Sequence, residues 1–177
     1  MALLPEILLR RSRKKFANRN VPKEIVTEII TAAQLAPSCF NNQPARFIIV
    51  HDEHLKELHP ALSRGNAWAK EAPFLLALTS RADLDCQITD RDYFLLGCGL
   101  QLENLILQAV HRGLFAHPLA GFNEDVARSA LGVPVDHRIY TLVAVGYPDE
   151  NEDLEDKGRK PMGEIAYDQS WGDPFNG

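Results

Sequence analysis

Hydrophobic positions along the chain repeat with a helical period in some segments and form short continuous runs in others. Residues 22–36 show the clearest helical period, because one apolar stripe faces a polar side until Pro37 ends the pattern. Residues 91–112 predict the longest helix, which is apolar around most of its circumference and therefore central or at a subunit interface. Shorter helical patterns cover residues 3–11, residues 52–60 with Asp52 as the expected N-cap, and residues 123–131.

Four segments carry strand patterns. Residues 47–50 and 74–79 are continuous apolar runs, which are typical of buried strands. Residues 138–147 are rich in apolar and β-branched residues, and residues 114–120 predict a short strand followed by a turn. We find no internal repeat and no second domain, so the 177 residues predict a single domain.

A polar loop joins the helix at residues 22–36 to the strand at residues 47–50. Pro37 and Pro44 bracket this loop, which carries Ser38, Asn41, Asn42 and Gln43. A short loop that is held between a helix and a core strand places amide and hydroxyl groups at fixed positions on a rigid scaffold. The pattern therefore indicates a ligand-binding loop.

Two cationic clusters lie far apart in the sequence. In residues 10–16 five of the seven residues are cationic, and Arg10, Ser12 and Lys14 alternate, so an extended backbone would point them to one side. Two cations and a hydroxyl on one side suit a phosphate group. A solvated basic segment and a basic nucleic-acid module remain alternatives. The second cluster, residues 157–161, follows an acidic segment at residues 149–156 that we expect to be extended and solvated.

Composition and charge narrow the class of protein. The chain has 19 basic and 24 acidic residues and a formal net charge of −5, which disfavours a dedicated nucleic-acid binder. Its three cysteines are odd in number and lack CxxC spacing, so we expect no zinc site, no disulfide framework and a reducing compartment. We expect neither a signal peptide nor an apolar segment near the roughly 20 residues of a membrane span. These features predict a soluble, cytoplasmic protein.

Several short blocks, in this order, resemble the FMN-dependent nitroreductase family. They are Arg10-Arg11-Ser12-x-Lys14-x-Phe16, Ala36-Pro37-Ser38-x-x-Asn41-x-Gln43-Pro44-x-x-Phe47, His117-Pro118-Leu119-Ala120-Gly121-Phe122, Gly146-Tyr147-Pro148, Arg159-Lys160-Pro161 and Trp171-Gly172. No single block is specific, but the ordered set is, and it spans nearly the whole chain. The sequence departs from the family at Ala45, where an aromatic residue is common, and at Lys14, where arginine is common.

The resemblance implies an α+β fold with a mainly antiparallel central sheet flanked by helices. It implies that residues 1–177 form a single nitroreductase-like, FMN-binding domain. It also implies an intertwined homodimer that binds FMN at the subunit interface. In such a dimer the linker and C-terminal extension, residues 149–177, pack on the partner subunit. The aromatic residues of this tail fit that arrangement, because aromatic residues after a linker usually dock onto a surface.

The resemblance also implies roles for individual residues. The FMN phosphate and ribityl chain would be held by Arg10, Arg11, Ser12 and Lys14, with Lys157 and Arg159 closing on the phosphate. The other subunit would contribute Pro37, Ser38, Cys39, Asn41 and Gln43. Cys39 is unusual at this place, and we favour a small filler over a redox role of a low-pKa thiol. Along the isoalloxazine would lie Pro118, Leu119, Ala120 and Gly121, with a backbone N–H near flavin N5, while Asn66 would contact the pyrimidine side.

The implied activity is a ping-pong hydride transfer. NADH or NADPH would reduce flavin N5 and leave, and a small conjugated acceptor such as a nitroaromatic or a quinone would then take the electrons. No catalytic side chain is needed, because the flavin carries the hydride. The alternative is an FMN-binding carrier or sensor protein of the same fold with little turnover. A related flavin chemistry, such as reductive dehalogenation or flavin fragmentation, ranks lower because we find no additional lid sequence.

Overall fold

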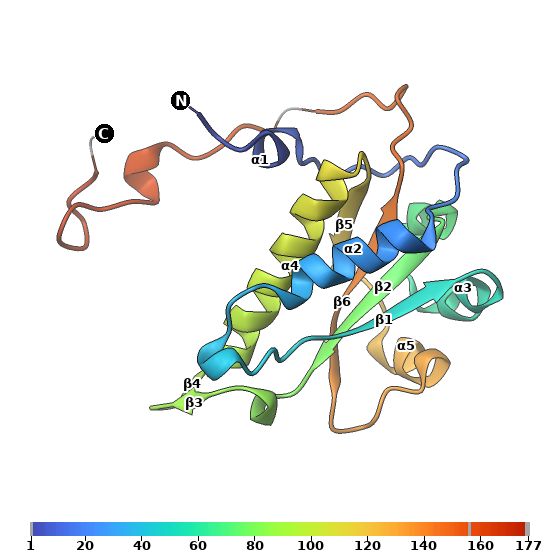
Figure 1. The fold of residues 1–177 in the computed structure, drawn as a ribbon, viewed down its shortest axis with the longest axis horizontal. Helices are drawn as coiled ribbons and strands as arrows, with labels where there is room; N and C mark the ends of the chain where they lie inside the picture. Colours follow the sequence, from blue (N-terminus) through green and yellow to red (C-terminus); the bar gives the residue numbers. More distant parts are fainter. Residues whose placement is uncertain (1, 156, 176–177) are drawn as a thin grey trace.

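A four-stranded antiparallel sheet forms the centre of the computed structural model, which describes residues 2–155 and 157–175 (Figure 1). The strand order is β1-β2-β6-β5, with β1 at Arg46–His51, β2 at Phe74–Ser80, β5 at Phe115–Leu119 and β6 at Arg138–Gly146. Every residue of β2 is buried, because the strand has neighbours on both sides and helices over both faces. This arrangement confirms the predicted α+β fold class.

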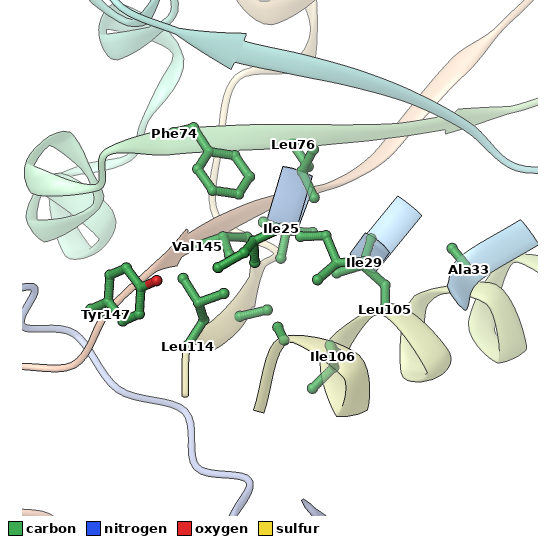
Figure 2. Close-up of a cluster of buried hydrophobic side chains, with 13 residues drawn as sticks. Ile25, Ile29, Ala33, Phe74, Leu76, Leu105, Ile106, Leu114, Val145 and Tyr147 are labelled. Atoms are coloured by element: carbon green, nitrogen blue, oxygen red, sulfur yellow. The ribbon is translucent and has the colours of Figure 1, made fainter. Parts of the chain in front are cut away.

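Two long helices cover one face of the sheet. These are α2, Lys23–Gln34, and α4, Tyr93–His111, which pack against each other. Figure 2 shows the core between them and the sheet, where Ile29 and Leu105 meet side chains of β2 and β6 such as Leu76. Both helices lie where the hydrophobic period predicts them, because burial of these stripes is what stabilises the helices.

The other face is covered by α3, Glu53–Leu58, and α5, Glu124–Leu131. Side chains alternate along a strand, so the neighbours of the first core, such as Leu75 and Leu142, point into this second core. The remaining elements are short: α1 at Pro5–Leu9, β3 at Gln87–Ile88, β4 at Arg91–Asp92, η1 at Cys39–Asn41, η2 at His59–Ala61, η3 at Arg64–Glu71, η4 at Ala82–Leu84 and η5 at Met162–Glu164.

Two local expectations are wrong. The strand at residues 47–50 is not fully buried, because β1 lies at an edge of the sheet and Ile49 is 43% exposed. Asp52 precedes α3 but forms no capping hydrogen bond among the described residues, since its φ of 53° is not the extended conformation of an N-cap. Its carboxylate instead lies 2.6 Å from Nδ1 of His51.

We expected no apolar segment near the length of a membrane span. Helix α4 differs from this expectation, because its 19 residues are long and apolar enough to span a membrane by length and composition alone. Seven of its residues, including Phe94, Leu105 and Ala109, are buried in the core. Leu95 and Leu96 on the opposite side are exposed. This helix is therefore a core helix with a second apolar face that its own chain leaves uncovered.

The acidic segment is not simply solvated, because its first part pairs with the cationic N-terminal segment. The N–H of Ala17 donates to the carbonyl of Tyr147 at 2.9 Å, and the N–H of Asp149 donates to the carbonyl of Lys15 at 3.1 Å. The side chain of Glu152 is 9% exposed, and its carboxylate accepts the N–H of Lys14 at 2.8 Å. We call residues 13–17 and 147–152, joined in this way, the terminal clasp.

Beyond the clasp, the C-terminal extension leaves the body of the protein and runs past α1 (Figure 1). It is organised locally, since the N–H of Phe175 donates to the carbonyl of Ala166 and the rings of Tyr167 and Trp171 lie 4.8 Å apart. Trp171 is nevertheless 90% exposed. The extension therefore presents a large apolar side chain to solvent.

Substitution of Gly146 by alanine should destabilise the protein by about 1–3 kcal/mol, because a Cβ there would lie 2.7 Å from both Phe16 and Pro73. Gly146 ends β6 beside the clasp, so this close contact also positions the cationic segment. Urea denaturation measures the loss. The matched control is Gly65→Ala, where a Cβ meets none of the described residues within 4 Å. Equal stability of the two variants would contradict the prediction.

Candidate functional site

The two cationic clusters line one cavity of about 740 Å³. Arg10, Arg11, Ser12 and Lys14 come from the N-terminal segment, and Lys157 and Arg159 come from the extension. The structure therefore brings together all six residues that the sequence predicts for a phosphate. The rest of the lining consists of Leu3, Ile7, Leu8, His117, Leu154, Glu155 and Gly158.

The terminal clasp is what brings the clusters together. Its backbone pairs hold residues 13–17 against residues 147–149, so the chain that leaves β6 must pass beside the cationic segment. Glu152 binds Lys14 through the backbone N–H rather than through the ammonium group, and its other oxygen lies 3.9 Å from the guanidinium of Arg13. The clasp thus leaves the charged end of Lys14 available to the cavity.

Most cations of the cavity have no acidic partner. Within the described ranges, none of Arg10, Lys14, Lys157 and Arg159 forms an ion pair. Two of the guanidinium groups bind backbone carbonyls instead: Arg11 donates to those of Leu8 and Arg10, and Arg159 donates to that of Gly158 at 2.7 Å. Four cations around one cavity create a positive potential that favours an anion carrying more than one charge.

An aromatic group surrounds His117, whose side chain lines the cavity. The rings of Phe16 and Phe115 lie 4.7 Å apart, and the ring of Trp68 lies 4.7 Å from that of His117. His117 also bonds to the cationic segment, since its Nδ1 lies 2.7 Å from the carbonyl oxygen of Arg13. Sequence reasoning missed both His117 and Trp68, although His117 directly precedes the predicted Pro118 and so carried a signal.

The loop after β5 is held by a different part of the chain. The side-chain amide of Asn66 and the N–H of Ser63 both donate to the carbonyl of Gly121, at 2.9 and 3.1 Å. A Cβ at Gly121 would lie 2.7 Å from Oγ of Ser63, so glycine permits this close approach. In this chain Asn66 therefore positions the loop, whatever it contacts in a ligand.

Leu119, the last residue of β5, differs from the residues that follow it. Its side chain is buried in the second core, and its N–H donates to the hydroxyl of Thr141 at 3.1 Å. Neither group is free for a ligand. A contact from the predicted stretch at residues 118–121 therefore falls to Pro118, Ala120 and Gly121, of which Ala120 is exposed.

The polar loop at residues 37–43 lies away from the cationic cavity. Helix α4 separates the two regions, because Pro44 packs against Gly97 near one end while Glu6 of α1 bonds to His111 at the other. These positions are 14 residues apart, or roughly 20 Å of helix, and Figure 1 shows η1 and α1 at opposite ends of α4. Five predicted residues are therefore absent from the cavity of their own chain: Pro37, Ser38, Cys39, Asn41 and Gln43.

The backbone of this loop is unusual. Phe40, Asn41 and Gln43 have φ values of 48°, 60° and 51°, in the left-handed region that non-glycine residues rarely adopt. Such residues cost about 1–3 kcal/mol each and cluster at binding sites. The N–H of Gln43 donates to Oγ of Ser38 at 2.8 Å, which holds the loop closed. Phe40 projects to solvent with 89% exposure.

A disulfide between Cys39 and Cys86 also holds this loop, so the expectation of unpaired cysteines is wrong. The two residues are 47 positions apart, and only the fold brings them together, which is why their spacing gave no signal. Cys39 is thus half of a cystine rather than a small filler. Beside it, the amide of Asn42 donates to the carboxylate of Asp85 at 3.2 Å, and Cys98 is a buried free thiol.

The sequence and the fold of this chain are similar to those of known proteins. The family model described as the Nitroreductase family matches residues 7–81 and 61–147. A crystal structure described as an oxidoreductase containing FMN is 27% identical, with a TM-score of 0.84, and the match covers 98% of this chain and 94% of that chain.

Two curated proteins extend the comparison. A protein of Thermus thermophilus named NADH dehydrogenase is 29% identical over 174 residues, which cover 81% of this chain and 85% of that protein. An iodotyrosine deiodinase of Haliscomenobacter hydrossis is 27% identical over 185 residues, which cover 85% of this chain and 81% of that protein. The chain is therefore similar, over most of its length, to proteins that are named for different activities.

The disulfide should contribute about 2–4 kcal/mol to stability, because it closes a loop of the unfolded chain. Cys39→Ser with Cys86→Ser should lose that amount in urea denaturation under non-reducing conditions. Wild type should fall to the stability of the variant when dithiothreitol is added, whereas the variant should not respond. Denatured, unreduced wild type should show one reactive thiol, that of Cys98. Three reactive thiols would contradict the assignment.

Proposed function

The chain belongs to the nitroreductase family, and we propose that it is an FMN-dependent NAD(P)H oxidoreductase whose cationic cavity holds the FMN phosphate. The observation that carries the proposal is that two cationic segments from opposite ends of the chain line one cavity. A phosphate monoester carries about −1.5 to −2 charges at pH 7, which suits a cavity whose cations form no ion pair among the described residues. The FMN named for a similar structure and the NADH named for a relative support the same assignment.

The proposal gives each cationic residue of the cavity, and Ser12, a specific role. Arg10 and Arg159 offer guanidinium groups, which can donate two hydrogen bonds to one phosphate. Lys14 and Lys157 add compact charges, and the hydroxyl of Ser12 donates a hydrogen bond. Arg11 donates to two backbone carbonyls, whereas Arg159 donates to one, so we assign Arg11 to holding the segment rather than to the phosphate.

The flavin ring, when bound, supplies hydride transfer between a nicotinamide and a small conjugated acceptor, for which a nitroaromatic or a quinone is the class we propose. The residues of this chain orient the ring and exclude water. Ala120 and Gly121 directly follow β5, whose His117 lines the cavity, so the chain would offer these two residues to the ring edge. An FMN-binding protein with little turnover is the alternative, and it would bind FMN without oxidising NADH or NADPH.

We propose that the active protein is a homodimer. The loop at residues 37–43 has the rigid backbone of a binding loop but lies too far from the cavity of its own chain, so it would serve the flavin of a second copy. The outer face of α4, with Leu95, Leu96 and Leu100, provides an apolar surface for that copy.

The C-terminal extension would pack on the second copy as well. Its exposed apolar residues include Ile165 and Trp171. A groove of about 560 Å³ between α2 and the edge strand β1, lined by residues such as Val26 and Ile49, offers a seat for it. An uncovered sheet edge beside an apolar groove is a surface that proteins usually cover.

Ser12→Ala combined with Lys14→Ala should raise the dissociation constant of FMN about 100-fold, because each lost contact to a charged group costs at least about 1.5 kcal/mol. Quenching of FMN fluorescence measures it. The matched control is Lys56→Ala with Ser129→Ala, which removes the same groups from exposed positions. Wild type that is colourless and binds no added FMN would refute the proposed function. Equal affinity in both double variants would refute the assignment of the cavity.

Ending the chain after Lys160 should abolish dimerisation and weaken FMN binding, while the clasp and the cavity residues remain. Analytical ultracentrifugation measures the first effect and flavin absorbance the second. Ending the chain after Asp149 should be more severe, because it also removes Glu152, Lys157 and Arg159. A dimeric, yellow protein lacking residues 161–177 would show that the extension does not hold the dimer.

A further inference from the structure

His117 is the one imidazole that lines the cationic cavity in the described part of the chain. It lies on β5, it is half-buried, and the proposed binding of FMN by cationic residues leaves its role open. Its ring is held at two points, by the carbonyl of Arg13 and by the ring of Trp68. A histidine fixed in this way presents one nitrogen at a defined position.

The hydrogen bonding of His117 determines which nitrogen that is. Nδ1 lies 2.7 Å from the carbonyl oxygen of Arg13, and a carbonyl can only accept, so Nδ1 carries a proton. Nε2 forms no hydrogen bond with the described residues, and it is not among their buried unpaired atoms. Nε2 is therefore accessible, and the accessible space beside this half-buried ring is the cavity.

The surroundings keep the ring neutral before an anion binds. Burial is the main cause that lowers the pKa of His117 below its usual value, and the charges of Lys14 and Arg10 lower it further. The bond to the Arg13 carbonyl and the charge of Glu152 act in the opposite direction but are weaker than burial. The other charged residues that line the cavity are Arg11, Glu155, Lys157 and Arg159.

A bound phosphate would favour the protonated form of His117 instead of the neutral form. A neutral Nε2 is an acceptor and would face phosphate oxygens that are also acceptors, whereas a protonated Nε2 donates to them. We propose that His117 is a phosphate ligand of the cavity and that it takes up a proton when FMN binds. The inference rests on the proposed function, and it adds that cofactor binding is coupled to protonation.

The sign of the coupling follows from linkage. If binding takes up protons, the affinity falls as pH rises, by up to tenfold per pH unit between the pKa of His117 in the free protein and its higher pKa in the complex. The second pKa of a phosphate monoester is about 6, so the phosphate releases a proton on binding mainly at lower pH. Measurements at pH 7.5 therefore isolate the uptake by His117.

Isothermal titration calorimetry with FMN at pH 7.5, in two buffers of different ionisation enthalpy, measures the proton uptake directly. Wild type should take up a measurable fraction of a proton, and at most one proton, with FMN. It should take up none with riboflavin, which lacks the phosphate. This comparison requires no variant.

Two variants sharpen the test. His117→Asn can still donate to the Arg13 carbonyl but cannot titrate, so its proton uptake should vanish, and its affinity should become flat with pH between pH 7 and pH 8.5. The matched control, His54→Asn, removes an exposed imidazole of α3 and should behave as wild type. Uptake that is equal for FMN and riboflavin, or unchanged in His117→Asn, would overturn the inference while leaving FMN binding intact. Absence of FMN binding would overturn the proposed function, and this inference with it.

Discussion

The pairing of the two ends of the chain is the interaction on which the site depends. Cations repel one another, so four of them gather around a cavity only where something else holds their backbones in place. The terminal clasp does this with main-chain hydrogen bonds and the carboxylate of Glu152, which binds a backbone N–H and leaves the ammonium group of Lys14 free. The positive potential of the cavity is thus a consequence of backbone pairing.

Elements that depend on local pattern were predictable, and those that depend on tertiary neighbours were not. The helices α2 and α4 and the strand β2 follow from hydrophobic period, because burial of those positions stabilises them. An apolar run in the sequence looks the same whether it forms a central strand or an edge strand. The partial exposure of β1 could therefore be predicted only from the order of the strands in the sheet. The bond between Cys39 and Cys86 likewise needed the fold, since 47 residues separate the two.

The candidate site shows the same division. Alternation of Arg10, Ser12 and Lys14 was sufficient to predict that they share one cavity. Sequence cannot tell which polar groups are already engaged in hydrogen bonds within the chain. It therefore did not reveal that Asn66 donates to the Gly121 carbonyl or that the N–H of Leu119 donates to the hydroxyl of Thr141. It also gave His117 no role, because the role proposed for it depends on its burial and on the carbonyl of Arg13.

The two halves of the proposed site reach rigidity by different physical means, and this has a consequence for stability. The loop at residues 37–43 is held by a disulfide, a hydroxyl and unusual backbone angles, so it is preorganised without a ligand. The cavity is instead electrostatically unfavourable when empty, and an anion relieves its repulsion. A ligand that binds only the folded state stabilises it in proportion to the logarithm of its concentration over the dissociation constant. FMN would therefore be part of the stability of this fold as well as its redox group.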